Sequence, residues 1–133
     1  MLLHEKKILT YANSLEEFNR HNGIVLTKVD VDFAECVIQL TEDSLDDDGY
    51  VHNGLIFSIA DVATGFAAFS TYRHCVTAGA SLNFFHPAKG TLIRAEAITV
   101  DSGERLATVT GNIYDDENTL VASGIFTYCF LDR

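Results

Sequence analysis

The segment from His52 to Ser70 constrains the fold more than any other part of the sequence, because it is long, apolar and almost free of charge. It spans 19 residues and is rich in alanine, which favours a helix over a strand. Asp61 is its one acidic residue, and it contains no lysine or arginine. A helix without a charged face is buried on both sides. We therefore expect one side to cover a sheet and the other to meet a second subunit.

A helical wheel separates the two expected faces. The sheet-facing side is one broad apolar face formed by Leu55, Ile56, Ile59, Val62, Ala63, Phe66 and Ala67. The opposite side carries Gly54, Phe57, Ser58, Asp61, Thr64, Gly65 and Ala68. A carboxylate on such a surface is costly unless it is paired or hydrogen-bonded. Asp61 therefore has two interpretations: a structural acid satisfied by a hydroxyl or by water, or a general base or nucleophile.

Alternating apolar and β-branched residues predict strands on both sides of this helix. Two strands form a hairpin at 24–30 and 33–40, and four follow the helix at 75–85, 91–100, 105–114 and 119–130. A short helix is expected at 14–20. Because the turns between the strands are short, neighbouring strands must be antiparallel. The sequence thus predicts an α+β fold with an antiparallel sheet of five or six strands and one long helix.

Composition limits the domain organisation and the partners. No linker, repeat or low-complexity tract interrupts the 133 residues, so we expect a single domain over 1–133. The net charge of −10 argues against nucleic acid and anionic membrane surfaces as partners. No apolar run approaches the roughly 20 residues of a membrane span, and the first residues lack the apolar core of a signal peptide. Three widely spaced cysteines are typical of a reducing compartment, so a cytoplasmic protein is expected.

The spacing of the histidines, acids and serines does not indicate a metal site or a serine hydrolase. The five histidines are scattered, and the acidic run at 46–49 lacks the alternating ligands of a calcium loop. We therefore expect neither a metal nor a cofactor. Ser58 and Ser70 do not lie in a Gly-x-Ser-x-Gly turn, which disfavours a serine hydrolase.

Residues 52–61, HNGLIFSIAD, resemble the His-Gly-Gly-x-x-Phe-x-Leu-x-Asp signature of hotdog-fold acyl-CoA thioesterases, and the PaaI-like (phenylacetate-pathway) group in particular. Residues 83–88, NFFHPA, resemble the strand-to-proline turn of the same family. The resemblance implies a hotdog fold, in which the antiparallel sheet wraps around the long central helix. It also implies hydrolysis of acyl-CoA to free acid and CoA. The implied assembly is a homodimer or dimer of dimers with active sites between protomers.

The resemblance assigns catalytic roles to five matching positions. Asp61 falls on the catalytic acid, as general base or nucleophile. Asn53 and Gly54 fall on the pair whose backbone N–H groups help to form the oxyanion hole. His52 falls on a positioning histidine, and Thr77 on a serine that helps to position water. Asn53 departs from the family glycine, and its side chain narrows the mouth of the pocket.

Substrate contacts are expected at four further positions. Asp46 falls where related enzymes place an asparagine, and its charge in place of an amide donor leaves its role open. Phe57 could line the acyl pocket, although core filling explains it equally well. His86 could contact the substrate beside the turn. Lys89, with Arg73 and Arg94 as alternatives, is a candidate cation for the phosphates of CoA.

The spacing of Asn53 and Asp61 carries a prediction of its own. Eight residues of helix separate them by about 12 Å, at about 1.5 Å per residue. Both cannot contact one carbonyl carbon from the same chain. An antiparallel copy of the helix, crossing near Phe57, would bring Asp61 of one protomer opposite residue 53 of the other. The spacing therefore predicts a site shared across a two-fold axis.

Two alternatives to a thioesterase remain at this point. The first is a non-catalytic module that binds acyl-CoA as a sensor, although such regulators usually carry an N-terminal DNA-binding helix pair. Here about 20 residues without a basic cluster precede the first strand. The second is a dehydratase of the same fold, whose helix normally supplies a histidine–acid arrangement that this sequence does not match. The acyl group and the choice between dimer and tetramer stay open.

Overall fold

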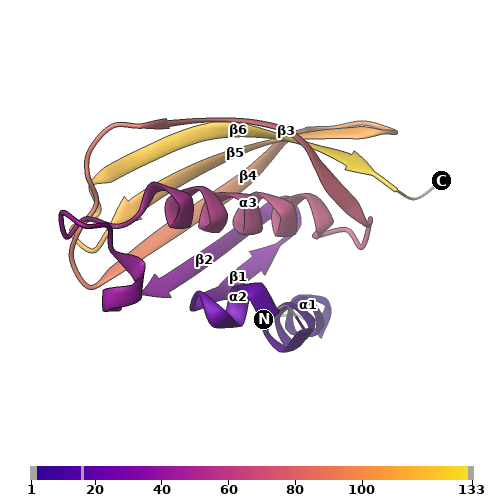
Figure 1. Cartoon of the computed structure of the whole chain (residues 1–133). Helices are drawn as coiled ribbons and strands as arrows, with labels where there is room; N and C mark the ends of the chain where they lie inside the picture. The colour runs from indigo at the N-terminus through magenta and orange to yellow at the C-terminus, as the bar shows by residue number, and fades with distance from the viewer. Residues whose placement is uncertain (1–2, 16, 132–133) are drawn as a thin grey trace.

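A six-stranded antiparallel sheet curls around one long helix, α3 (Asn53–Phe69), as Figure 1 shows. The computed structural model describes residues 3–15 and 17–131. The strands are β1 (Ile24–Asp30), β2 (Phe33–Gln39), β3 (Cys75–Phe84), β4 (Leu92–Ser102), β5 (Leu106–Asp115) and β6 (Leu120–Phe130). The predicted α+β class, the antiparallel pairing and the long helix are confirmed.

The strand order is β1-β2-β4-β5-β6-β3, so β1 and β3 form the two edges of the sheet. The hairpin β1–β2 comes before α3 in the chain, and β3 after it returns to the opposite edge. The helix therefore lies within the curve of the sheet and contacts all six strands. A short 3₁₀ turn, η1 (Glu42–Ser44), leads into an exposed loop before α3 begins. None of the described helices has the length and apolarity needed to cross a membrane.

Small side chains on α3 allow the curved sheet to close tightly around it. Ala60, Ala63 and Ala67 are completely buried. Across from them, Gly111 of β5 comes so close to α3 that an added Cβ would lie 3.0 Å from the Cγ2 of Thr64. Burial of this face provides the main stabilisation of the fold, because apolar burial scales with the area removed from water.

The rotation of α3 differs from the one that the helical wheel predicts. Thr64 and Ala68 were expected on the outer side, and both are buried in the core. Val62 and Phe66 were expected against the sheet, and both line a groove on the other side of the helix. The wheel ranks positions by hydrophobicity, whereas the inside of a curved sheet selects for small volume. Asp61 nevertheless lies on the groove side, as predicted.

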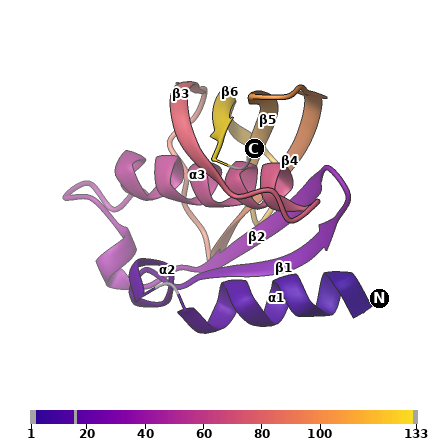
Figure 2. The ribbon, with the colours of Figure 1, turned by 90° about the vertical axis from the view of Figure 1, so that its right-hand side faces the viewer.

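The N-terminal segment also differs from the prediction. The structure has α1 (Leu3–Leu15) and α2 (Glu17–His21) in place of a single short helix at 14–20. Figure 2 shows α1 running along the edge strand β1. Ile8 and Ala12, four residues apart on one helical face, are buried in the core cluster. That spacing was the signal available in the sequence for α1.

A side chain from α1 occupies part of the β1 edge. The amide nitrogen of Asn13 donates to the Leu26 carbonyl oxygen at 2.9 Å, and its carbonyl oxygen accepts from the Leu26 N–H at 3.0 Å. The register between β1 and β2 shifts between Leu26 and Lys28. Bulges and covered backbone groups hinder an edge strand from pairing with another chain.

Candidate active site

Asp61 lies in the middle of α3 and is anchored through one carboxylate oxygen. Oδ1 accepts a hydrogen bond from the Thr77 hydroxyl at 2.7 Å and another from the Tyr128 hydroxyl at 2.8 Å. Within the described ranges, Oδ2 has no hydrogen-bond partner. The acid is therefore satisfied by hydroxyls, as its structural interpretation expects, and still keeps one oxygen for a reaction.

The two hydroxyls come from neighbouring strands. Thr77 of β3 and Tyr128 of β6 are directly opposite each other in the antiparallel register, so both side chains point to the helix. The Tyr128 hydroxyl also lies 2.7 Å from the Thr64 hydroxyl. Burial, with the charge of Asp61 as a second cause, raises the pKa of Tyr128 well above its usual value. Tyr128 thus stays a protonated donor towards the acid.

An open groove of about 670 Å³ runs along α3 beside Asp61. Phe57, Val62 and Phe66 of the helix give it apolar walls, and Thr77 lies on its β3 side. Tyr11 of α1 and Phe18 of α2 line it from the N-terminal helices. Phe57 is in contact with the core ring of Phe126, with ring centroids 5.4 Å apart, and is 39% exposed. Its side chain can therefore serve both the core and the groove.

The start of α3 is capped by His52. The Nδ1 atom of its ring accepts the N–H of Gly54 at 2.9 Å, and its backbone is extended, with φ −61° and ψ 132°. Nδ1 is therefore unprotonated in this arrangement, which places the ring proton on Nε2. The backbone N–H of His52 donates to the Ser44 carbonyl oxygen at 2.9 Å. His52 fixes where the helix begins and in which direction it runs.

One of the two predicted oxyanion donors is already used. Because the Gly54 N–H donates to the His52 ring, it is not free within the protomer. The N–H of Asn53, the first residue of the helix, has no acceptor among the described residues. It points from the positive end of the helix dipole, where a developing negative charge is stabilised.

The other predicted substrate residues lie in loops beside the start of α3. The Oδ1 atom of Asp46 accepts the N–H groups of Asp48 at 2.9 Å and Tyr50 at 3.0 Å, so this carboxylate shapes its own loop. His86 and Lys89 are exposed in the turn after β3. That turn adjoins the helix start, since the Val51 N–H donates to the Ala88 carbonyl oxygen at 2.8 Å. None of these side chains lines the groove beside Asp61.

The structure therefore gathers the predicted residues into two groups. Asp61, Thr77 and Phe57 share the groove. His52 and Asn53, with the neighbouring loops, surround the start of α3. About 12 Å of helix separates Asn53 from Asp61, at about 1.5 Å per residue over eight residues. Tyr128 belongs to the first group and was not predicted, because its contact with Asp61 depends on the strand register.

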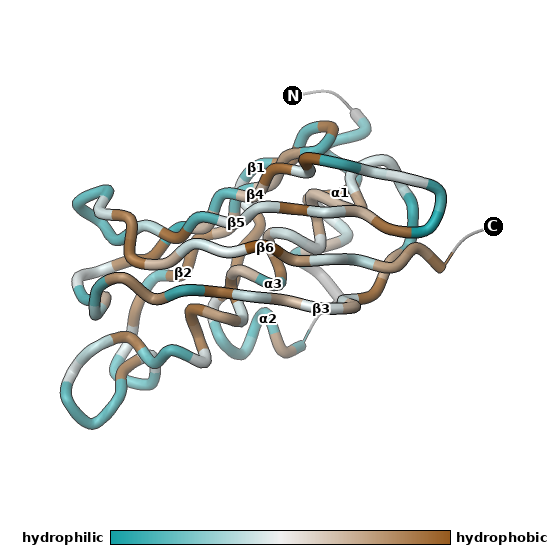
Figure 3. The backbone as a smooth tube through the Cα atoms, turned by 90° about the horizontal axis from the view of Figure 1, so that it is seen from above, coloured by the Kyte–Doolittle hydropathy of each residue, from teal (hydrophilic) through white to brown (hydrophobic). Residues whose placement is uncertain are grey.

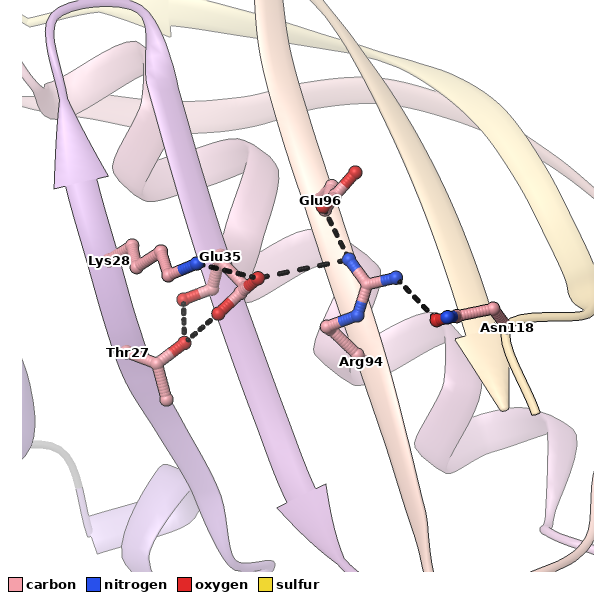
Figure 4. Close-up of polar contacts among 6 residues, drawn as sticks. All are labelled: Thr27, Lys28, Glu35, Arg94, Glu96 and Asn118. Carbon is pink, nitrogen blue, oxygen red and sulfur yellow. Dashed lines mark hydrogen bonds and ion pairs between the residues drawn. The ribbon is translucent and has the colours of Figure 1, made fainter. Parts of the chain in front are cut away.

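Arg94, an alternative cation for CoA, is held on the outer face of the sheet (Figure 4). Its guanidinium pairs with Glu96, lies 3.7 Å from Glu35 and donates to Asn118 at 3.1 Å. It also lies over the ring of Tyr114, 4.6 Å from the centroid. These partners neutralise its charge and keep it away from the groove.

Arg73, the other alternative, is also held by the fold. Its guanidinium donates to the carbonyl oxygens of Gly103 at 2.9 Å and Glu104 at 2.7 Å, and it lies 3.6 Å from the centroid of the Phe130 ring. Of the three cations considered, Lys89 alone projects from a turn beside the helix start.

The described residues offer little other reactive chemistry. Over residues 3–15 and 17–131, no three metal-ligating side chains gather at one place. Cys36 is completely buried in β2, and burial, followed by the charge of Glu35, raises the pKa of its thiol far above the usual value. It therefore stays protonated and unreactive.

An antiparallel sheet closed around a single long helix defines the hotdog fold, which thioesterases share. The family model described as Thioesterase superfamily matches residues 48–122, more than half of the chain, and the protein belongs to this family. The matched residues contain α3, Asp61 and Thr77. The predicted membership of a thioesterase family is thus confirmed.

Known proteins share this fold at low sequence identity. The PaaI protein of the phenylacetic acid degradation operon of Escherichia coli superposes with a TM-score of 0.91 at 19% identity, over 97% of this chain and 94% of that one. A thioesterase from Haemophilus influenzae gives 0.86 at 16%, over 99% and 93%. A Saccharolobus solfataricus protein named as an esterase is 27% identical over 115 residues, which cover 85% of this chain and 77% of that protein. The predicted hotdog, PaaI-like fold is confirmed.

Proposed function

We propose that this thioesterase hydrolyses acyl-CoA thioesters to a free acid and CoA, with Asp61 as the reacting group. The observation that carries the proposal is the asymmetry of the Asp61 carboxylate: two hydroxyls hold Oδ1, and Oδ2 is left beside an apolar groove. Thioester hydrolysis needs a base or nucleophile next to the acyl carbon and a donor for the developing oxyanion. The apolar walls of the groove suit the acyl chain.

Two routes use the same atoms. As a base, Oδ2 takes a proton from water while the water oxygen bonds to the acyl carbon. As a nucleophile, Oδ2 bonds to that carbon itself, and water then cleaves the resulting anhydride. In both routes the carbon–sulfur bond breaks, the thiolate of CoA takes up a proton, and the acyl group leaves as a carboxylic acid.

The proposed oxyanion donor is the N–H of Asn53 from a second protomer. Within one protomer Asn53 and Asp61 are about 12 Å apart, too far to contact one carbonyl group. A two-fold axis that brings two copies of α3 together in antiparallel fashion would place each acid near the other helix start. Because the Gly54 N–H already donates to the His52 ring, the Asn53 N–H is the main oxyanion donor of the pair.

The open edge of the sheet supports this assembly. Most residues of β3 are exposed, and β3 borders the groove. Both edge strands have a register shift, at Leu26/Lys28 in β1 and at Thr77/Gly79 in β3, and β1 is in addition covered in part by Asn13. An unprotected edge strand is a template for pairing with another chain. We therefore propose a dimer formed through β3, whose two-fold axis brings the two α3 helices together.

The outer face of the sheet supports a dimer of dimers. The outward residues of β5, β6 and β3 include Thr110, Ile125 and Ser81, and no outward residue of these strands is charged. Figure 3 shows the sheet from this side. Ile125 is 53% exposed. In a chain with a net charge of −10, an uncharged face is suited to packing against a second copy. Size-exclusion chromatography with light scattering distinguishes dimer from tetramer.

A panel of acyl-CoA thioesters with aliphatic and aromatic acyl groups tests the proposal. The wild type should release CoA from at least one of them, and Asp61→Asn should lower kcat by roughly 10²–10⁴-fold, the usual contribution of a positioned base. Asp101→Asn, an exposed acid near the end of β4, is the matched control. Circular dichroism verifies that both variants fold. If the wild type binds acyl-CoA without hydrolysing any member of the panel, the protein is an acyl-CoA-binding sensor and the proposed thioesterase activity is wrong.

A further inference from the structure

Tyr128 of β6 contacts Asp61 from the inner face of the sheet, and the sequence did not predict a role for this residue. We propose that Tyr128 is a positioning residue: its hydroxyl fixes the side chain of Asp61 so that Oδ2 alone is presented to the substrate. The inference rests on the proposed function, because it assigns a task within that reaction. Tyr128 borders the groove but exposes only 3% of its surface, and its hydroxyl is directed at Asp61.

The single proton of the Tyr128 hydroxyl is shared by two oxygens of Asp61. The phenol oxygen lies 2.8 Å from the carboxylate Oδ1 and 2.6 Å from the main-chain carbonyl oxygen of the same residue. A rotation of the Asp61 side chain would therefore separate its carboxylate from a donor that stays bound to its backbone. Thr77 adds a hydrogen bond to the same Oδ1 at 2.7 Å. Together the two hydroxyls select one rotamer and one oxygen.

The available protons fix the direction of the hydrogen bond between Tyr128 and the Asp61 carboxylate. The phenol has a single proton, and burial and the charge of Asp61 both raise the pKa of Tyr128, so the proton stays on the phenol. An ionised carboxylate can only accept, so Tyr128 must be the donor. The completely buried Thr64 hydroxyl lies 2.7 Å from the phenol oxygen and 2.8 Å from the Ala60 carbonyl oxygen. Because the phenol proton is directed at Asp61, a hydrogen bond between these two hydroxyls is donated by Thr64, whose single proton is then not available to Ala60.

The surroundings of Tyr128 make it a rigid support. β6 lies inside the sheet between β5 and β3, and Phe126 and Phe130 are buried on either side along the strand. On the helix, Gly65 gives the ring its space: an added Cβ there would lie 3.4 Å from the phenol oxygen. Sites built on strands and helices hold reacting groups more precisely than sites on loops. Precise placement matters because small displacements from the reactive geometry lower rates strongly.

The test compares Tyr128→Phe with Tyr114→Phe, which removes a phenol hydroxyl on the outer face of the sheet. Tyr128→Phe should lower kcat by about tenfold to a hundredfold, the range for a lost hydrogen bond to a charged group. KM should change little, because the phenol hydroxyl is directed at Asp61 and the ring exposes only 3% of its surface to the groove. Tyr114→Phe should change neither kcat nor KM.

A second measurement keeps the inference separate from the proposed function. Crystal structures of the wild type and of Tyr128→Phe show the side-chain rotamer of Asp61 directly. In the variant this side chain should occupy more than one rotamer, even if the wild type hydrolyses no thioester. If Tyr128→Phe does not fold, 3-fluorotyrosine at position 128 keeps the shape of the ring, alters the donor strength of its hydroxyl and should change kcat. A single, unchanged Asp61 rotamer in Tyr128→Phe, an unchanged kcat in the fluorinated protein, or a loss of thermal stability with wild-type kcat overturns the inference.

Discussion

Thr77 and Tyr128 face each other across the β3–β6 ladder, and both of their hydroxyls donate to Oδ1 of Asp61. The orientation of an acid on the central helix is thus decided by a cross-strand pair in the sheet. Because β3 is an edge strand that also borders the groove, its pairing with β6 links the strand order directly to the geometry of the site.

Replacing Thr77 by valine removes one of the two donors while keeping the β-branched shape that suits a strand. We expect kcat to fall by about tenfold, since a hydrogen bond to a charged group is lost. Thr77→Ser keeps the hydroxyl and should retain most of the activity. Thr27→Val, on β1, is the control, because it removes a hydroxyl that donates to the Glu35 carboxylate at 2.7 Å, away from Asp61. Wild-type kcat in Thr77→Val would show that this hydroxyl is not needed.

His52 is expected to contribute to stability as the N-cap of α3. His52→Ala leaves the Gly54 N–H without its acceptor and should lower the free energy of unfolding by about 1 kcal/mol, the usual cost of a lost cap. His52→Asn can still accept that N–H and should lose less. Urea denaturation of both variants measures the difference. His21→Ala, at the exposed end of α2, is the control; equal losses in all three variants would contradict a capping role.

Gly124 of β6 allows the close approach of β3. A Cβ at this position would lie 2.2 Å from the Ser81 carbonyl oxygen and 2.9 Å from the Cα of Leu82. Because both atoms belong to the backbone, Gly124→Ala must displace β3, and we expect a loss of about 1–3 kcal/mol in the free energy of unfolding. In Gly79→Ala the new Cβ meets no atom within 4 Å. Thermal unfolding should therefore separate the two variants clearly; similar melting temperatures would contradict the predicted clash.

Asp116 should make part of the stability dependent on pH. Its Oδ2 accepts the N–H of Thr91 at 2.8 Å and the hydroxyl of the same residue at 2.9 Å, and these bonds lower the pKa of Asp116 below its ordinary value of 3.8. A lowered pKa in the folded state means that the ionised form stabilises the protein. That contribution is complete above pH 3.8 and is lost as the pH falls through the lower folded value.

Urea unfolding of the wild type and of Asp116→Asn at neutral and at acid pH measures this contribution. The variant should be less stable than the wild type at neutral pH, and the difference should shrink in acid. Asp101→Asn serves as the control for loss of a surface charge. A difference that stays constant over the pH range would show that the hydrogen bonds of Asp116 do not depend on its ionisation.

Several features could be predicted from the sequence because local patterns determine them. The apolar run from 52 to 70 predicts α3, alternating residues predict the strands, and the lone acid on that run identifies Asp61. The spacing between Asn53 and Asp61 survives unchanged, since the rise of a helix is constant. Helix α1 was missed although a local pattern indicates it: Ile8 and Ala12, both buried, have the spacing of residues on one helical face.

The remaining features of the site were decided only by the tertiary structure. The rotation of α3 depends on which side chains fit the curve of the sheet, and this placed Thr64 in the core and Phe66 in the groove. Tyr128 is 67 residues away from Asp61 in the sequence, and the two come into contact because of the register of β3 against β6. A strand pattern shows which residues share a face but not which residue lies opposite, because that choice is made by long-range packing. The sequence by itself thus determined the elements and the acid, and packing between distant segments decided what holds the acid in place.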